Sequence, residues 1–220
     1  MFFLTVAKAM NEEQRIEVCK TGLTQIYTML ATSPQSWRNY VTLARSVITH
    51  LDATTLMTQP TRTTEQAWMI AGLQRLASQD ADNGGVPDVA SWCSRQWLAI
   101  SQRDSQNVSA LRGIGQSWLA RAQPILRRIH RAENSSSSSG GSSSRSAPSL
   151  SRSDEDRQSV ASIAEAERRA GTEDYVEARG YLQPATEYLE RAVAAATTQR
   201  SLSGDLLATV SLFTLFVTKR

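Results

Sequence analysis

Apolar residues recur at helical spacing along most of this chain. Between residues 107 and 118, the large apolar side chains of Leu111, Ile114 and Trp118 fall on one helical face. Gly115 lies beside them and leaves room for a second helix to approach closely. This pattern is typical of a helix that packs against a neighbouring helix, and not of a catalytic site.

The same periodicity predicts a series of helices separated by short breaks. The expected helices cover residues 11–31, 35–51, 64–77, 88–102, 107–133, 154–170 and 173–196, followed by an apolar segment at 206–217. Pro34, Pro60 and the glycine pair at 84–85 mark breaks between them. No stretch alternates strictly between apolar and polar residues, as a half-buried strand would. The sequence therefore predicts an all-α fold.

A serine-rich segment divides the chain. Residues 134–153 are nearly all Ser, Gly and Arg, and no apolar residue lies between Asn134 and Ala147. Such a segment cannot bury an apolar face, so we expect it to be disordered. The expected organisation is a helical-repeat region at 1–133, a disordered Ser/Gly-rich linker at 134–153, and C-terminal helices at 154–220 that complete or continue the repeat stack.

Ser149, Ser151 and Ser153 are candidate phosphorylation sites within this linker. Arg145 precedes Ser149 by four residues, and an acidic run begins directly after Ser153. A phosphate on Ser153 would add about −2 of charge just before an expected helix start, where the helix dipole favours it. A plain flexible linker without any switch is the alternative interpretation.

Two segments resemble the first helix of a tetratricopeptide repeat (TPR). They are Trp68-Met-Ile-Ala71-Gly72 and Leu111-Arg-Gly-Ile114-Gly115-Gln-Ser-Trp118. The segment that carries Ala178, Leu182 and Ala185 is similar to the second helix of such a repeat. The resemblance implies antiparallel helix pairs stacked as a short α-solenoid, with the serine-rich segment as an insert.

The chain also departs from the pattern of this family. A tetratricopeptide repeat has about 34 residues, whereas 43 residues separate Trp68 from Leu111. A longer connection through the loop at 83–85 would supply the difference. Pro124 and Pro184 lie inside expected helices, and the resemblance covers only residues 64–196 of the chain.

The resemblance implies a non-catalytic adaptor or scaffold that holds a segment of a protein partner in a groove formed by the first helices. Met69, Arg112 and Gln116 are the expected exposed contacts, because they follow the opening apolar residue or the glycine of those helices. These positions lack the Lys and Asn that hold a peptide carboxylate in some co-chaperones of the family. We therefore expect no clamp of that type, although Arg112 and Gln116 suit an acidic or polar peptide.

Composition and charge do not point to nucleic acid. Of the 220 residues, 40% are hydrophobic and 20% charged, and the net charge is only +3. The basic residues after Trp118 are Arg121, Arg127, Arg128 and Arg131. They could contact phosphates, but the preferred interpretation is a solvated helix face.

Candidate catalytic and metal-binding residues are sparse. His50 and His130 are isolated in the sequence, and neither Cys19 nor Cys93 has a metal-ligand companion at useful spacing. Cys93 lies on an apolar helix stripe, where a packed thiol is expected. The chain has no phosphate-binding glycine loop and no hydrolase motif. We expect no enzyme activity, no cofactor and no metal.

The apolar segment at 206–217 allows three interpretations. It is a core helix that ends the fold, the altered tail of a chain truncated relative to longer relatives, or a membrane anchor. Its 12 residues fall short of the roughly 20 that a spanning helix needs. A membrane-associated helical protein is the alternative function. With no secretion signal in the sequence, the expected location is intracellular, cytoplasmic or nuclear.

Overall fold

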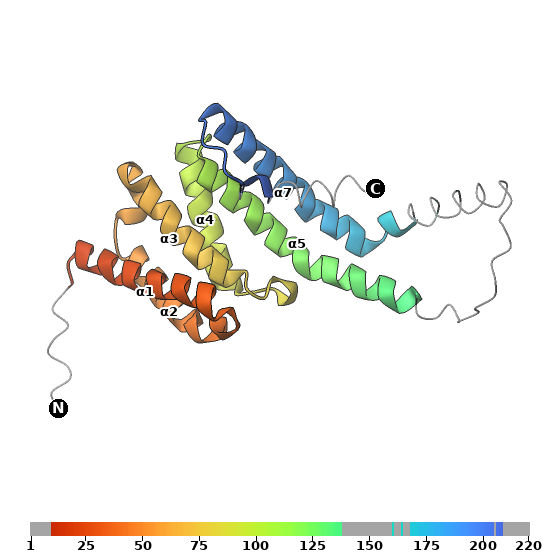
Figure 1. Ribbon diagram of the computed structural model, residues 1–220, viewed down its shortest axis with the longest axis horizontal. Helices are drawn as coiled ribbons and strands as arrows, with labels where there is room; N and C mark the ends of the chain where they lie inside the picture. Colours follow the sequence, from red (N-terminus) through yellow and green to blue (C-terminus); the bar gives the residue numbers. More distant parts are fainter. Residues whose placement is uncertain (1–9, 138–159, 161–163, 165–167, 205, 209–220) are drawn as a thin grey trace.

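The computed structural model describes residues 10–137, 160, 164, 168–204 and 206–208. Every regular element in these residues is an α-helix or a 3₁₀ helix, so the prediction of an all-α fold is confirmed (Figure 1). The α-helices are α1 (Glu12–Thr32), α2 (Val41–Asp52), α3 (Thr63–Ala77), α4 (Pro87–Arg103), α5 (Val108–Ser137) and α7 (Glu173–Thr198). Short 3₁₀ helices are η1 (Pro34–Tyr40), η2 (Leu56–Thr58), η3 (Pro60–Arg62) and η4 (Ala81–Asn83).

Local sequence signals set most of the helix ends. At the start of α1, the side chain of Asn11 accepts a hydrogen bond from the backbone N–H of Gln14 at 2.8 Å. The Gln14 side chain accepts one from the backbone N–H of Asn11 at 3.0 Å, which completes a capping box. Before α4, Gly84 and Gly85 have φ angles of 92° and 61°, which favour glycine and reverse the chain.

Two expected boundaries are wrong. The helix expected at 35–51 is split, because the chain after Pro34 forms η1 and the α-helix begins only at Val41. The helix expected to end at residue 133 continues through Pro124 to Ser137, inside the segment expected to be disordered. Within this extension, the Ser135 hydroxyl donates to the Arg131 carbonyl oxygen at 2.9 Å.

Some of the segments predicted from the sequence lie outside the described residues. They are residues 138–153 of the expected linker, which include Ser149, Ser151 and Ser153, and most of the expected helix at 154–170. Of the segment at 206–217, only 206–208 are described. Leu206 is buried against Leu111 and alanines of α7, as a core residue would be. None of the described helices has the length and apolar character needed to cross a membrane.

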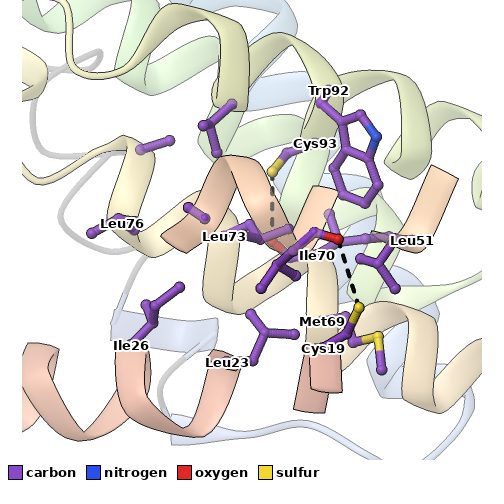
Figure 2. Close-up of a cluster of buried hydrophobic side chains, with 14 of the residues drawn as sticks. Cys19, Leu23, Ile26, Leu51, Met69, Ile70, Leu73, Leu76, Trp92 and Cys93 are labelled. Carbon is purple, nitrogen blue, oxygen red and sulfur yellow. Dashed lines mark hydrogen bonds between the residues drawn. The ribbon is translucent and has the colours of Figure 1, made fainter. Parts of the chain in front are cut away.

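Most helices that follow one another in the chain pack as neighbours. The contacts join α1 to α2, α3 to α4, α4 to α5, and α5 to α7, and α3 also contacts both α1 and α5 (Figure 1). The largest hydrophobic core lies among α1–α4 and includes Ala110 and Ile114 from the start of α5. Figure 2 shows Met69, Ile70 and Leu73 of α3 at the centre of this core. Smaller clusters fix α5 to α7.

The close helix approach expected at Gly115 is confirmed, and the neighbour is α7. A Cβ atom on Gly115 would lie 2.7 Å from Cγ of Leu189 and 3.2 Å from the carbonyl oxygen of Ala185. Real Cβ atoms do not come this close to a side chain, so α7 rests directly on the backbone of α5. Ala178 and Ala185, which the resemblance placed at packing positions, are buried in the same interface.

We expect Gly115→Ala to lower the free energy of unfolding by about 1–2 kcal/mol, because overpacking here costs more than the gain in helix propensity. Gly180→Ala is the matched control, since nothing lies within 4 Å of a Cβ at that position of α7. Gly180→Ala should raise the free energy of unfolding by about 0.5–1 kcal/mol. Urea denaturation followed by circular dichroism measures both. Equal stabilisation by the two alanines would contradict the tight α5–α7 contact.

Candidate functional site

A cleft of about 630 Å³ opens where α1, α3 and α5 meet. Its lining includes Tyr27 of α1, Trp68 and Arg75 of α3, Trp97 of α4, and Arg112 and Gln116 of α5. Thr64, Trp68, Ala71 and Arg75 all face it from α3, at the spacing of one helical face. This volume is within the usual range for ligand sites in proteins, about 300–1,000 Å³.

Two aromatic side chains form one wall of the cleft. The rings of Tyr27 and Trp68 stack with their centroids 5.4 Å apart and their planes at 26°. The Tyr27 hydroxyl donates a hydrogen bond to the backbone oxygen of Trp68 at 2.9 Å. Gly72 provides the space for this arrangement, because a Cβ there would lie 2.8 Å from the Tyr27 ring. Although its ring is fixed in this way, Trp68 is 38% exposed.

The cleft carries positive charge. Arg75 is exposed, its guanidinium lies 6.0 Å from the centroid of the Tyr27 ring, and it forms no ion pair with another described residue. Burial raises the pKa of the Tyr27 hydroxyl, and the charge of Arg75 opposes that rise. Arg112 also lines the cleft, and among the residues that the structure describes no carboxylate does.

A buried hydrogen-bond relay forms the floor of the cleft. The Trp97 indole N–H donates to Oε1 of Gln74 at 2.7 Å. The Gln74 side-chain N–H₂ in turn donates to the Gly113 backbone oxygen at 2.8 Å and to the Ser117 hydroxyl at 2.9 Å. Because Gln74 belongs to α3, Trp97 to α4 and Gly113 to α5, these bonds hold three helices in fixed relation. The floor is therefore rigid.

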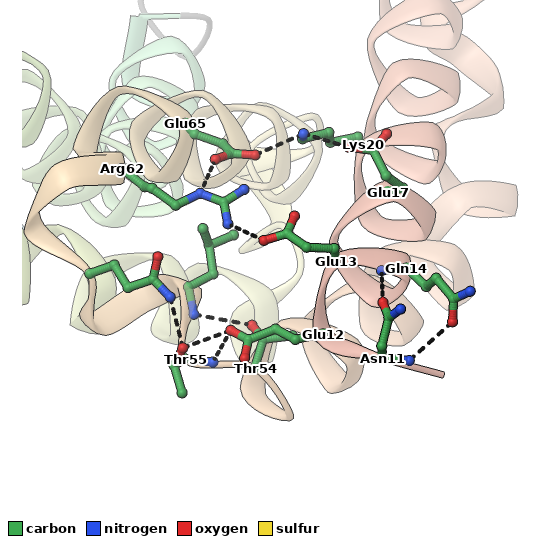
Figure 3. A network of polar contacts seen from close by, with 12 residues as sticks. Asn11, Glu12, Glu13, Gln14, Glu17, Lys20, Thr54, Thr55, Arg62 and Glu65 are labelled. Atoms are coloured by element: carbon green, nitrogen blue, oxygen red, sulfur yellow. Dashed lines mark hydrogen bonds and ion pairs between the residues drawn. The ribbon is translucent and has the colours of Figure 1, made fainter. Parts of the chain in front are cut away.

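A second polar network sets α1 against the start of α3 (Figure 3). Glu65 accepts from Nε of Arg62 at 2.6 Å and pairs with Lys20 of α1 at 3.0 Å. Arg62 also pairs with Glu13 of α1 at 3.0 Å. The hydrogen bond from Arg62, more than the one from Lys20, lowers the pKa of the Glu65 carboxyl. The network helps to place Tyr27 beside Trp68.

This network makes stability depend on pH in a defined direction. Because folding lowers the pKa of Glu65, its carboxylate stabilises the native state at pH values above its ordinary pKa of 4.5. That contribution is lost as the pH falls through the folded pKa. Glu65→Gln should therefore cost about 1 kcal/mol at pH 7 and progressively less as the pH falls below 4.5.

Thermal unfolding of the wild type and Glu65→Gln across this pH range measures the difference. Glu17→Gln is the control, since among the described residues Glu17 forms an ion pair only with Lys20, and its side chain is 65% exposed. It should change stability by no more than a few tenths of a kcal/mol at any pH. A Glu65→Gln effect that stays constant from pH 7 to pH 3 would contradict the ion-pair origin.

The structure corrects one of the three expected partner contacts. Arg112 and Gln116 do line the cleft. Met69 does not, because it is fully buried in the main core (Figure 2). The reason is the rotational setting of α3, which turns Trp68 toward the cleft and the following residue toward the core. Neither Trp68 nor its partner Tyr27 was expected as a contact, because the resemblance treats the opening large residue of such a helix as a packing residue.

Three of the four arginines after Trp118 have intramolecular partners among the described residues, namely Arg121, Arg127 and Arg128. Arg128 pairs with Asp174 at 2.8 Å and with Glu177 at 2.7 Å, which joins α5 to α7. Arg127 donates to the side-chain oxygen of Asn83 at 2.7 Å. Arg121 lies over the ring of Trp118 at 4.9 Å. The sequence favoured a solvated face for these arginines, and the structure instead bonds two of them, Arg127 and Arg128, to other parts of the chain.

The cysteines are packed in the core. Burial raises the pKa of Cys19 to about 11 and raises that of Cys93 as well. Their sulfur atoms contact the backbone oxygens of Val47 at 3.6 Å and Ile70 at 3.7 Å. Both thiols are therefore protonated at neutral pH, as expected for Cys93. Within the described ranges, no group of three or more His, Cys, Asp or Glu side chains is placed to hold a metal ion.

A smaller hollow of about 290 Å³ lies near the end of α3 and the start of α4. Ser91, Ser94, Arg121 and Tyr181 are among its lining residues, and Gln74 borders both this hollow and the cleft. Its volume is below half that of the cleft and at the lower limit for small-molecule sites. The cleft is the stronger candidate for a functional site.

Comparison with other proteins adds no relative. No protein-family model matches the chain, and neither the curated proteins nor the solved structures give a match. The similarity to tetratricopeptide repeats therefore depends on the sequence pattern alone. Any function has to be argued from the cleft and its residues.

Proposed function

We propose that this protein is a non-catalytic adaptor that binds a segment of a partner protein in the cleft across α1, α3 and α5. The observation that carries the proposal is the exposed Trp68 ring, stacked on Tyr27 inside a cleft of about 630 Å³. Tryptophan, tyrosine and arginine are enriched among the residues that dominate protein–protein binding energy. All three line this cleft, with Arg75 beside the aromatic pair.

The order of helix contacts supports this proposal. The chain packs as α1 with α2, α3 with α4 and α5 with α7, α3 lies between α1 and α5, and α4 also contacts α5. In our interpretation this is a short TPR-like α-solenoid, in which the first helix of each pair lines a concave binding surface. The cleft lies along those first helices. Both cysteines are free buried thiols, which suits a reducing compartment, the cytoplasm or the nucleus.

Site-specific photo-crosslinking in cells tests the proposal. A photoreactive amino acid replaces Thr64 or Ser109, which are exposed and line the cleft, or Leu98, which is 43% exposed and does not line it. We expect the same protein to be crosslinked from Thr64 and Ser109 and not from Leu98. Adding Trp68→Ala should remove both crosslinks. Binding in the cleft would be refuted if the partner is crosslinked equally from Leu98. It would also be refuted if Trp68→Ala leaves the crosslinks from Thr64 and Ser109 unchanged.

A further inference from the structure

We infer that the cleft recognises an acidic peptide segment that carries an aromatic side chain, with the aromatic ring on Trp68 and a carboxylate on Arg75. This inference rests on the proposed function, because it takes the cleft as the binding surface. It adds the chemistry of the partner and the spacing of its two anchoring groups.

The aromatic contact follows from the way Trp68 is held. Tyr27 stacks on the indole, and its hydroxyl is bonded to the Trp68 backbone. The ring is therefore fixed before any ligand arrives, while 38% of the residue stays exposed. A second aromatic ring can pack on that exposed part with little additional loss of side-chain entropy. A fixed aromatic surface of this kind favours a flat apolar side chain over an aliphatic chain.

The charged contact follows from the position of Arg75. Arg75 follows Trp68 by seven residues, which is two turns along the same face of α3. Its guanidinium forms no ion pair with another described residue, and the described lining offers it no carboxylate. A guanidinium without a carboxylate partner among the described residues can bind the carboxylate of a ligand through two parallel hydrogen bonds. The charge of the cleft therefore selects an acidic segment.

The distance between the two contacts sets the spacing in the ligand. Seven residues of α-helix span about 10 Å, and an extended peptide covers that length in about three residues. We expect the aromatic residue and the carboxylate to be about three positions apart. Across the cleft, the Gln116 side chain makes no hydrogen bond with another described residue, so its amide can pair with the peptide backbone.

Aromatic rings beside arginine can also bind single-stranded nucleic acid. The ion pairs of the arginines outside the cleft argue against a nucleic-acid ligand here. A nucleic-acid strand needs a continuous basic track for its phosphates. Several arginines outside the cleft are already paired with carboxylates. They are Arg38 with Asp80, Arg45 with Asp88, Arg62 with Glu13 and Glu65, and Arg128 with Asp174 and Glu177. These pairs neutralise much of the basic charge outside the cleft, which favours a short acidic segment over a nucleic-acid strand.

The test starts with selection from a random-sequence peptide library against the full-length chain. The strongest peptide is then labelled and titrated by fluorescence anisotropy, beside a version with Asn and Gln in place of Asp and Glu. A single-stranded RNA of similar length is titrated in parallel. We expect selected peptides to place an acidic residue about three positions from an aromatic one. Neutralising the acidic residues should weaken binding about fivefold to tenfold, and less at high salt.

Variants of the protein assign the two contacts. Trp68→Ala should weaken binding at least about tenfold. Arg75→Gln should make the acidic and neutral peptides bind equally well. Arg95→Gln is the matched control, because Arg95 is exposed on α4 and does not line the cleft, so it should leave affinity unchanged. Because Arg75 is exposed, Arg75→Gln should leave the fold intact. It therefore still tests the charged contact if Trp68→Ala lowers the stability of the protein.

Failure of this inference is separable from failure of the proposed function. If neutral peptides are selected and Trp68→Ala still weakens them, the cleft binds protein but the acidic specificity is refuted. If RNA binds more tightly than every selected peptide, a peptide ligand is refuted. If no peptide binds in the cleft and the crosslinks at Thr64 and Ser109 are absent, both proposals are overturned.

Discussion

Met69→Lys should unfold the protein instead of weakening a partner contact. Met69 has no exposed surface and lies among Leu23, Ile70 and Leu73 in the largest core. A lysine ammonium at this position would be buried without a carboxylate, which costs about 3–5 kcal/mol or more. Because small domains are stable by only about 5–15 kcal/mol, we expect most of the protein to lose its cooperative thermal transition.

Two neighbouring substitutions serve as controls for Met69→Lys. Met69→Leu keeps volume and polarity, so it should cost less than about 1.5 kcal/mol. Trp68→Lys changes the adjacent, exposed residue, so it should abolish peptide binding while the protein stays folded. Thermal unfolding followed by circular dichroism, together with the anisotropy titration, separates the two effects. A folded Met69→Lys protein with lost binding would show that Met69 is a cleft contact after all.

Trp97→Ala should lower the free energy of unfolding by about 3–5 kcal/mol. Trp97 is only 2% exposed, and its ring lies directly on the backbone of Gly113. Removing the indole leaves a cavity between α4 and α5 and takes away the donor to Gln74 at 2.7 Å. Urea denaturation measures the change. Leu98→Ala alters the next residue, which is 43% exposed, and should change stability by less than about 0.5 kcal/mol.

Trp97→Phe distinguishes packing from hydrogen bonding at the floor of the cleft. Phenylalanine keeps much of the buried area but cannot donate to Gln74, so we expect an intermediate loss of about 1–3 kcal/mol. A Trp97→Ala variant that loses less than about 1 kcal/mol would contradict the role of this side chain in holding three helices together.

The sequence was sufficient to predict the number and order of the α-helices up to residue 133, but not the 3₁₀ helices between them. Hydrophobic periodicity and strong breaks set these elements, and the glycine at 115 correctly indicated a close helix neighbour. The sequence did not predict which face of α3 lines the cleft. Apolar residues surround most of that helix, namely Trp68, Met69, Ile70, Ala71, Leu73, Leu76 and Ala77. Periodicity alone therefore cannot fix the rotation of the helix, and packing against α1 and α4 decides it.

The cleft was only partly predictable for a second physical reason. Its floor and its aromatic wall depend on contacts between distant parts of the chain. Trp97 and Gln74 are 23 residues apart, and Tyr27 and Trp68 are 41 apart. Local propensity carries no information about such pairs. Arg112 and Gln116 could be named in advance because the resemblance to tetratricopeptide repeats places contacts directly after the opening apolar residue and after the glycine, here Leu111 and Gly115.

Gly113 and Gly115 give α5 two different neighbours within two residues of chain. The Trp97 ring rests on the first, and Leu189 of α7 rests on the second. A larger side chain at Gly113 would displace Trp97 and change the floor of the cleft, and one at Gly115 would push α7 away from α5. Stability and ligand selection are therefore separable only at other positions, such as Thr64 and Ser109. A protein built on this plan can acquire a new partner by varying the rim of the cleft, provided that these two glycines stay as they are.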